Sequence, residues 1–213
     1  MSMYDIGALK AGDWVEYESK SKAPGGGGDN VSKTRYACVK VDSLVWLEMT
    51  AAGYDGWYIL VGMDKSDRSV KKAYMGEKDK EAKEIKVEPA PATGAVTTNY
   101  KTRGTGKVSK DTVTVKGTAF DCEKVESEST TTVDGKDYKA KTAYWACEKV
   151  SFRYYWDEKA NATANADFKW EGKPSVKGGY VKSWSESSGS GSEMNLVAWG
   201  NDAKMSVKLP APK

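Results

Sequence analysis

Three cysteines lie in closely similar five-residue stretches, and they are the first residues in this chain that could do chemistry. The stretches read ACVKV (Ala37–Val41), DCEKV (Asp121–Val125) and ACEKV (Ala146–Val150). A thiolate can bind zinc, attack an electrophile or form a disulfide, and each activity needs particular neighbours. The chain has no C-x-x-C pair and no histidine, so a zinc site is disfavoured. The spacing instead indicates three strands of similar alternation.

Two of the cysteines are candidates for a disulfide. Asp134–Gly135 lies between two long β-prone runs and predicts a two-residue type I′ turn. Counting outward from this turn places Cys122 opposite Cys147 in a non-hydrogen-bonded pair, whose Cα atoms approach to about 4.5 Å. The same register opposes Asp121 and Glu148, which is unfavourable. The alternative is that Cys122 and Cys147 are two buried thiols that pack as small hydrophobic groups.

Cys38 has no such partner in the sequence. It is expected to be a buried strand thiol. The alternative is a reactive thiol whose pKa is lowered by Lys40, which shares its strand face.

The absence of histidine argues against catalysis. None of the 213 residues is a histidine, which removes the commonest general base, metal ligand and partner of a nucleophile. Paired carboxylates for glycoside chemistry remain an alternative, but none of the 30 acidic residues is singled out. The sequence therefore predicts a protein that is not an enzyme, with no catalytic residue, no metal site and no cofactor.

Charge and composition restrict the partners and the compartment. Thirty-three basic and thirty acidic residues are spread along the chain with a net charge of +3, which disfavours a nucleic-acid partner. No apolar run approaches the roughly 20 residues of a transmembrane helix. The first twelve residues lack the basic start and apolar stretch of an export signal, so an export signal is either absent or already removed. Eight Trp and twelve Tyr among abundant Thr and Val are typical of β-proteins.

The chain pattern predicts an all-β fold with little helix. Alternating strands start at Gly12–Ser21 and Val31–Val41 and continue through LVWLEMT and WYILVGM as an antiparallel meander. We expect a curved sheet, a half-open barrel or a sandwich, in a single domain over residues 1–213. Two subsheets, residues 12–88 and 99–209, are joined by a Pro/Ala/Thr linker at 89–98. Two segments are less regular: Glu77–Lys83 fits a short exposed helix or a solvated strand pair, and Ser187–Ser192 a flexible loop.

Aromatic residues recur on nearly every predicted strand. SFRYYWD places Phe152, Tyr154 and Trp156 on one strand face. The plain interpretation is a Trp-rich core, and the sharper one is a groove for an apolar or glycan ligand. The candidate groove residues are Trp145, Phe152, Tyr154, Trp156 and Trp184.

Three motifs carry a family resemblance. GDWVEY near the start, VKGTAFDCEKVE in the middle and GGYVKSWSE with MNLVAWG near the end resemble a group of uncharacterised exported bacterial β-proteins. That group is similar to the half-barrels of periplasmic lipoprotein carriers, which hold an acyl chain in a concave apolar sheet. The resemblance implies a periplasmic, outer-envelope or secreted module that binds an apolar ligand, a lipid or a lipidated envelope protein. The alternative is a structural or adhesive module that assembles through strand edges or binds glycans.

Overall fold

The computed structural model describes residues 4–22, 30–50, 56–88, 100–153, 167–175, 177–187 and 189–211. These residues form a 3-10 helix, η1 (Ile6–Ala8), and a sheet of twelve strands. The strands are β1 (Trp14–Lys22), β2 (Asn30–Val41), β3 (Leu44–Thr50), β4 (Trp57–Asp64), β5 (Val70–Glu77), β6 (Lys83–Ile85), β7 (Tyr100–Val115), β8 (Thr118–Val133), β9 (Lys136–Cys147), β10 (Asp167–Glu171), β11 (Gly179–Ser187) and β12 (Ser190–Gly200).

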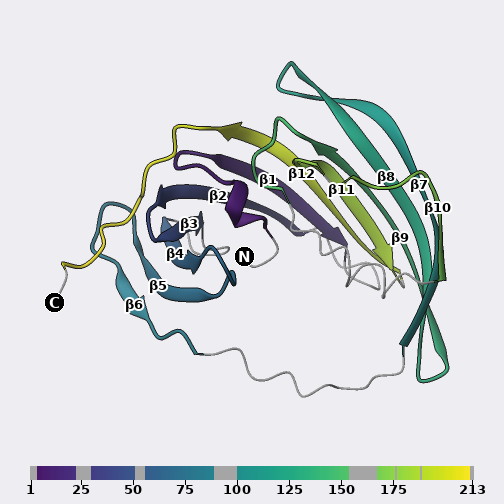
Figure 1. Ribbon diagram of the computed structural model, residues 1–213, viewed down its shortest axis with the longest axis horizontal. Helices are drawn as coiled ribbons and strands as arrows, with labels where there is room; N and C mark the ends of the chain where they lie inside the picture. The colour runs from purple at the N-terminus through teal and green to yellow at the C-terminus, as the bar shows by residue number, and fades with distance from the viewer. Residues whose placement is uncertain are drawn as a thin grey trace.

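All twelve strands belong to one sheet, in the order β10-β7-β8-β9-β11-β12-β1-β2-β3-β4-β5-β6. Neighbours are antiparallel except β10, which pairs with β7 in parallel. The sheet curls around η1 at β1–β5 and is more open across β7–β10, so it does not close (Figure 1). The predicted antiparallel, half-open curved sheet is therefore confirmed. The two predicted subsheets are parts of this single sheet, joined where β1 pairs with β12. The linker at 89–98 lies outside the described residues.

The pairing register divides the side chains between two faces. We call the concave face the one that carries Val15 and Tyr17 and, through successive strand pairs, Leu196, Ser183 and Tyr144. The convex face carries the alternate residues. This division follows from the two-residue period of a strand. At a bulge, the face of each residue is assigned from its partner on the neighbouring strand.

The core of the curled part lies on the concave face, beneath the N-terminal segment. Tyr4 contacts Tyr36 and Phe152 edge to face, each with a ring-centroid distance of 5.4 Å. Asp5 accepts a hydrogen bond of 2.7 Å from Arg153 Nε, and the Asp5 N–H donates to the Arg153 carbonyl oxygen at 2.9 Å. The N-terminal segment is therefore held against the segment that follows β9.

The C-terminal segment covers the convex face of β3–β5. Trp46, Leu60 and Tyr74 on that face are buried together with Val207, and Leu209 packs against them. Glu48 is 1% exposed, and its carboxylate accepts hydrogen bonds from Ser206 N–H at 2.8 Å and Ser206 Oγ at 2.7 Å. This part of the chain end is thus packed against the sheet, although its Lys/Pro-rich sequence resembles a frayed terminus.

The Asp134–Gly135 turn has the predicted geometry. Both residues have positive φ, 48° and 77°, as a type I′ turn requires. The register of β8 and β9 is the predicted one from Val133–Lys136 to Glu123–Ala146. There the ladder ends, one step before the two cysteines. The unfavourable Asp121–Glu148 pair does not form in the ladder, because Asp121 pairs with Thr112 on β7 instead.

All three cysteines are buried, free thiols. Burial raises the pKa of the Cys122 thiol to about 12, and the nearby Cys147 thiol adds to that rise. A disulfide between them stays a prediction, since Cys122 of β8 and Cys147 at the end of β9 lie on the same face, one step beyond the last pair of the β8–β9 ladder. Cys38 is the expected buried strand thiol, and burial raises its pKa to about 12. Lys40 does not activate it, because a bulge follows Cys38 and Lys40 pairs with Asp42 at 2.6 Å.

Two local predictions are settled by the backbone. The residues from Glu77 to Lys83 form the turn between β5 and β6, so the strand pair holds and the helix is wrong. Asp79 has φ of 62°, which a helix does not allow. Most of the Gly/Ser tract is also strand rather than flexible loop, because Ser187 pairs with Ser190 and Ser185 with Ser192.

Glu48→Ala should destabilise the protein by about 2–4 kcal/mol, because it leaves the Ser206 N–H and hydroxyl unpaired in a buried site. Glu48→Gln keeps one acceptor oxygen and should cost less. The free energy of unfolding, measured in urea, checks this order. A Glu48→Ala variant that unfolds at the wild-type urea concentration would show that the C-terminal segment is not anchored there.

The cysteines predict a defined labelling pattern. Folded, reduced protein at pH 8 should react with a thiol reagent very slowly, because all three thiols are buried and the raised pKa of Cys38 and Cys122, about 12, keeps those two protonated. After maturation in an oxidising compartment and denaturation without reductant, one cysteine should be labelled if Cys122 and Cys147 are bridged. Labelling of all three cysteines in that sample would contradict the Cys122–Cys147 disulfide. Reduced, denatured protein, in which all three should be labelled, is the control.

Candidate functional site

Exposed apolar side chains gather on the concave face. Among the strand residues whose exposure the structure describes, six large hydrophobic residues are more than a third exposed, and five of them face the hollow of the sheet. These five are Val41, Met75, Ile85, Tyr138 and Trp170. The sixth, Val31, is 52% exposed on the convex face. Exposed apolar surface on one face of a sheet marks a candidate binding surface.

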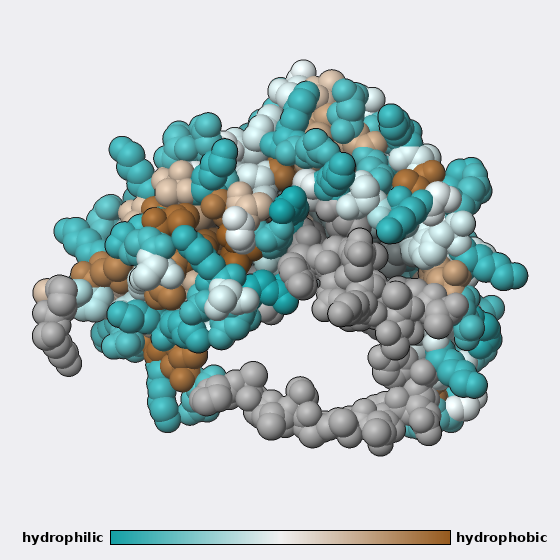
Figure 2. Space-filling view, in the orientation of Figure 1, coloured by the Kyte–Doolittle hydropathy of each residue, from teal (hydrophilic) through white to brown (hydrophobic). Residues whose placement is uncertain are grey.

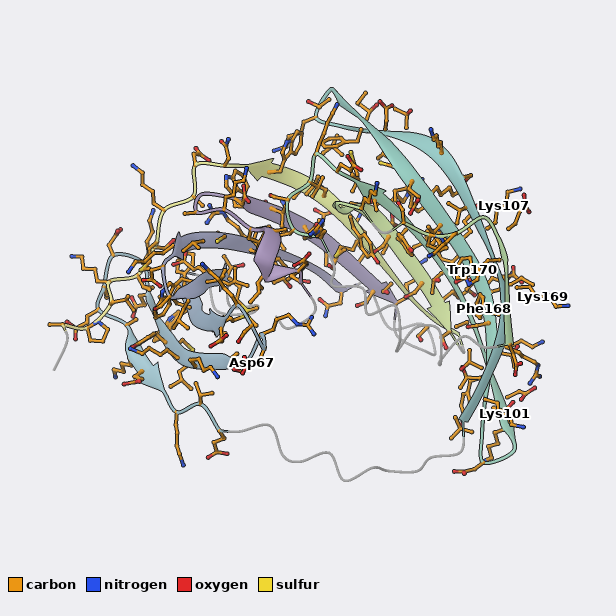
Figure 3. All side chains as sticks on the ribbon, viewed as in Figure 1. Asp67, Lys101, Lys107, Phe168, Lys169 and Trp170 are labelled. Carbon is orange, nitrogen blue, oxygen red and sulfur yellow. The ribbon has the colours of Figure 1, made fainter. Side chains whose placement is uncertain are left out.

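Most charged side chains lie on the opposite face, whereas Lys83 of β6 and Lys110, Asp121 and Glu123 near the β7–β8 turn lie on the concave face. On β1, β2, β10, β11 and β12, every charged residue with a registered partner faces the convex side. Figure 3 shows Lys107 and Lys169 pointing away from the hollow, and Phe168 and Trp170 on its inner side. Cross-strand ion pairs tie this face together: Lys107–Glu171 at 3.1 Å, Lys141–Glu128 at 2.8 Å and Lys182–Glu193 at 3.4 Å.

The concave surface ends at β10 in a pair of aromatic rings. Phe168 and Trp170 stack with a ring-centroid distance of 5.2 Å. They lie over Gly104 and Gly106 of β7, where an added Cβ would approach the rings to 2.5 Å and 2.1 Å. Glycine at both positions is therefore required, because any side chain there would displace the rings. Trp170 keeps 37% of its surface exposed.

Aromatic rings and hydroxyl groups line the middle of the same face. Tyr144 and Tyr180 stack at 4.8 Å, and burial raises the pKa of Tyr144 well above the ordinary tyrosine value. Beside them, Ser127 and Thr142 share a hydrogen bond of 2.8 Å across β8 and β9. These two hydroxyl groups therefore have a hydrogen-bond partner in each other. The neighbouring aromatic rings are the larger surface on this part of the face that a ligand could contact.

The opposite rim of the hollow carries two exposed aliphatic side chains, with Lys83 beside them on the same face. Met75 and Ile85, on β5 and β6, are 39% and 38% exposed. Ile59 on β4 pairs with Met75 and is half-buried beside it. Figure 2 shows hydrophobic residues gathered over the curled strands and beside β6, whereas the outer surface near β7–β10 is mostly hydrophilic.

The predicted groove residues are distributed differently from the expectation. Phe152 is fully buried in the core. Trp145 is a buried convex-face residue: its Nε1–H donates to Asp111 at 2.8 Å, and Lys124 and Lys182 lie over its ring. Trp184 faces the convex side and lines an open groove of about 610 Å³; most of the residues that line this groove face the convex side, many of them charged, and Trp170 lines it as well. Tyr154 and Trp156 lie outside the described residues.

Sequence reasoning missed the aromatic residues that do face the hollow. Phe168, Trp170, Tyr144 and Tyr180 were not singled out. A signal was present for two of them, because FKW alternates two rings about a lysine, and GTG alternates two glycines. Parallel pairing of these two segments places Phe168 beside Gly104 and Trp170 beside Gly106, and the sequence alone does not indicate this pairing.

The acidic turns have local structural roles. Asp64 accepts hydrogen bonds from Ser66, and Asp67 from Ser69. The Ser69 hydroxyl and N–H hold the pKa of Asp67 at about 2. Within the described ranges, no group of three or more metal-ligating side chains comes together. No helix in those ranges is long and apolar enough to span a membrane.

Comparison with known proteins leaves the family open. No protein-family model matches the chain, and no curated protein matches it.

Three solved structures are similar over most of the chain. A DUF1329 family protein from Desulfovibrio piger is 15% identical, covering 95% of this chain and 92% of its own, with a TM-score of 0.34. A protein classed as exported, with a YmcC-like fold, from Bacteroides fragilis is 11% identical over 90% of this chain and 97% of its own, with a TM-score of 0.35.

A domain named for outer-membrane lipoprotein sorting, from Vibrio parahaemolyticus, is 12% identical over 88% of this chain and 84% of its own, with a TM-score of 0.31. It belongs to the class that the sequence resemblance indicated, whereas the short motifs behind that resemblance are not supported by these comparisons. Such low identities and TM-scores do not transfer a function to this chain.

Proposed function

We propose that this protein is a non-enzymatic module of the bacterial envelope that holds an apolar ligand, a lipid or a lipidated protein, on its concave face. The observation that carries the proposal is the separation of the two faces. Five exposed apolar residues face the hollow, while the convex face is covered by ion pairs.

Partial exposure of these side chains leaves free energy for binding. Complete burial of a large apolar side chain contributes about 1.5–3 kcal/mol, so a residue that is more than a third exposed can still gain about 0.5–1 kcal/mol. Met75, Ile85 and Trp170 are in this condition. A ligand that covered all three would gain about 1.5–3 kcal/mol from them before other contacts are counted.

The envelope location rests on the sequence. The Trp-, Tyr- and Thr-rich composition and the resemblance to exported β-proteins support it. Two cysteines on adjacent strands, one step beyond the last registered β8–β9 pair, fit a compartment in which disulfides persist.

A glycan is the second candidate ligand. The exposed ring of Trp170 offers an apolar surface on which a sugar could stack, and the neighbouring concave rows are rich in serine and threonine. Assembly through the ends of the sheet is less favoured at β6, which has three residues, two of them charged.

Met75→Glu with Ile85→Glu should weaken binding of the apolar dye 1-N-phenylnaphthylamine about tenfold, because both changes place charge against the ligand. The control is Val31→Glu, which places one such carboxylate at an exposed valine on the convex face. Dye fluorescence titration measures both, and native mass spectrometry of freshly purified protein looks for a bound apolar molecule. Equal loss in Val31→Glu, or no loss in the double variant, would contradict concave-face binding.

Trp170→Ala should weaken dye binding by about threefold or more, whereas Trp184→Ala on the convex groove should leave it within experimental error. The same pair, titrated with soluble oligosaccharides by calorimetry, separates the two ligand classes. Oligosaccharide binding lost only in Trp170→Ala, with no dye binding in the wild type, would replace the lipid proposal with the glycan one.

A further inference from the structure

The outer edge of β7 is only partly paired within the described residues. β10 pairs with Arg103–Lys107, and the ladder stops there. Val108–Val115, the rest of β7, has no partner strand on that side among the described residues. In Figure 1 the β7–β8 hairpin continues past the end of β10 at the top of the view. This free edge spans eight residues, or about 26 Å.

The chain leaves β7 at a defined point. Gly172, directly after β10, has φ of 87°, and a Cβ added to it would lie 3.1 Å from Val108 Cβ. Ser175 then donates two hydrogen bonds to the Glu123 carboxylate, from its N–H at 3.0 Å and its hydroxyl at 2.8 Å. These contacts carry the segment across to β8, so it does not continue along β7.

The hydrogen-bonding phase leaves alternate peptide groups of β7 pointing outward. Lys116 and Gly117 have φ of 47° and 79°, which makes the β7–β8 connection a type I′ turn flanked by the hydrogen-bonded pair Val115–Thr118. Val108, Lys110, Thr112 and Thr114 therefore direct their N–H and C=O groups away from β8. Asp111 accepts from the Thr112 N–H at 2.8 Å, and the parallel pair Lys107–Glu171 uses the Val108 N–H, so two donors and four acceptors remain.

The surroundings of this edge combine polar and apolar surface. A groove of about 920 Å³ begins at Val108–Thr112 of β7 and extends over the face of the sheet, where Asp121–Glu123 of β8, Ala146, Glu148, Ser175 and Lys177 also line it. On the convex side, Val113 and Val115 are half-buried against the core, so an incoming strand would meet apolar surface there. On the concave side it would meet Lys110, Thr112 and Thr114, which favour polar neighbours.

We propose that Val108–Val115 is a strand-addition site for a short extended segment of another protein, with alternating apolar and polar residues. β10 is the precedent, because five residues already add to the same edge in parallel. The site is bounded by Glu171 of β10 and the following Gly172 at one end and by the β7–β8 turn at the other, which suits a short segment. The inference concerns the sheet edge and does not depend on the ligand of the concave face.

The test uses the full chain and a labelled peptide of about eight alternating valines and threonines, with a lysine at each end. Lys110→Pro with Thr114→Pro removes two outward N–H donors and leaves the bonds to β8 in place, because proline is tolerated where the N–H faces away from the sheet. Lys110→Ala with Thr114→Ala is the matched control that keeps both donors. Circular dichroism checks that both variants fold.

Fluorescence anisotropy should show that the wild type and the alanine control bind the peptide, and that the proline variant binds about tenfold or more weakly. The same peptide with alternate amides N-methylated should not bind. The proposal is overturned if the wild type does not bind the peptide, or if the proline variant binds it with the same affinity. Native mass spectrometry that shows a dimer, lost only in the proline variant, would overturn it in favour of a second copy of this chain.

Discussion

The pairing of β1 with β12 is the interaction on which the rest of this structure depends. It joins Trp14–Lys22 to Gly191–Gly200, two segments close to opposite ends of the chain. Without it, β1–β6 and β7–β12 would be two sheets, each with a newly exposed edge. The closure of so long a loop costs chain entropy that local turns do not. The register of this pairing also determines which side chains of β1–β6 share a face with which side chains of β7–β12.

Bulges let the sheet curl while its two faces stay chemically distinct. The β1–β12 ladder shifts between Glu16 and Tyr17, so Val197 is extra, and both Leu196 and Trp199 pair with concave-face residues. The β9–β11 ladder shifts in the same way at Val181. Each bulge bends its strand and increases the local twist. A sequence that alternated strictly over every strand would have given a flatter sheet and a shallower hollow.

Local features of the fold were predictable, and their placement was not. The Asp134–Gly135 turn sets the β8–β9 register by local geometry, and counting outward gave pairs as distant as Glu123–Ala146. Alternation also shows which residues of a strand share a face, but it cannot say which face becomes concave. Trp184 was therefore expected in the hollow and lies on the convex side. Glu48 is hidden from sequence reasoning for a related reason, since its partner Ser206 lies 158 residues away.

A single curved sheet has no second sheet to cover its concave face, so segments between the strands must do so. Tyr4, Phe152 and their neighbours cover the part of this face near β1 and β2 and build the core there. At β5, β6 and β10 the same face retains exposed Met75, Ile85 and Trp170. The core and the candidate site are thus two parts of one continuous surface, which differ only in what lies over them. Apolar residues at alternate positions are needed in both, and this is why Phe152 and Trp170 could not be told apart from the sequence pattern.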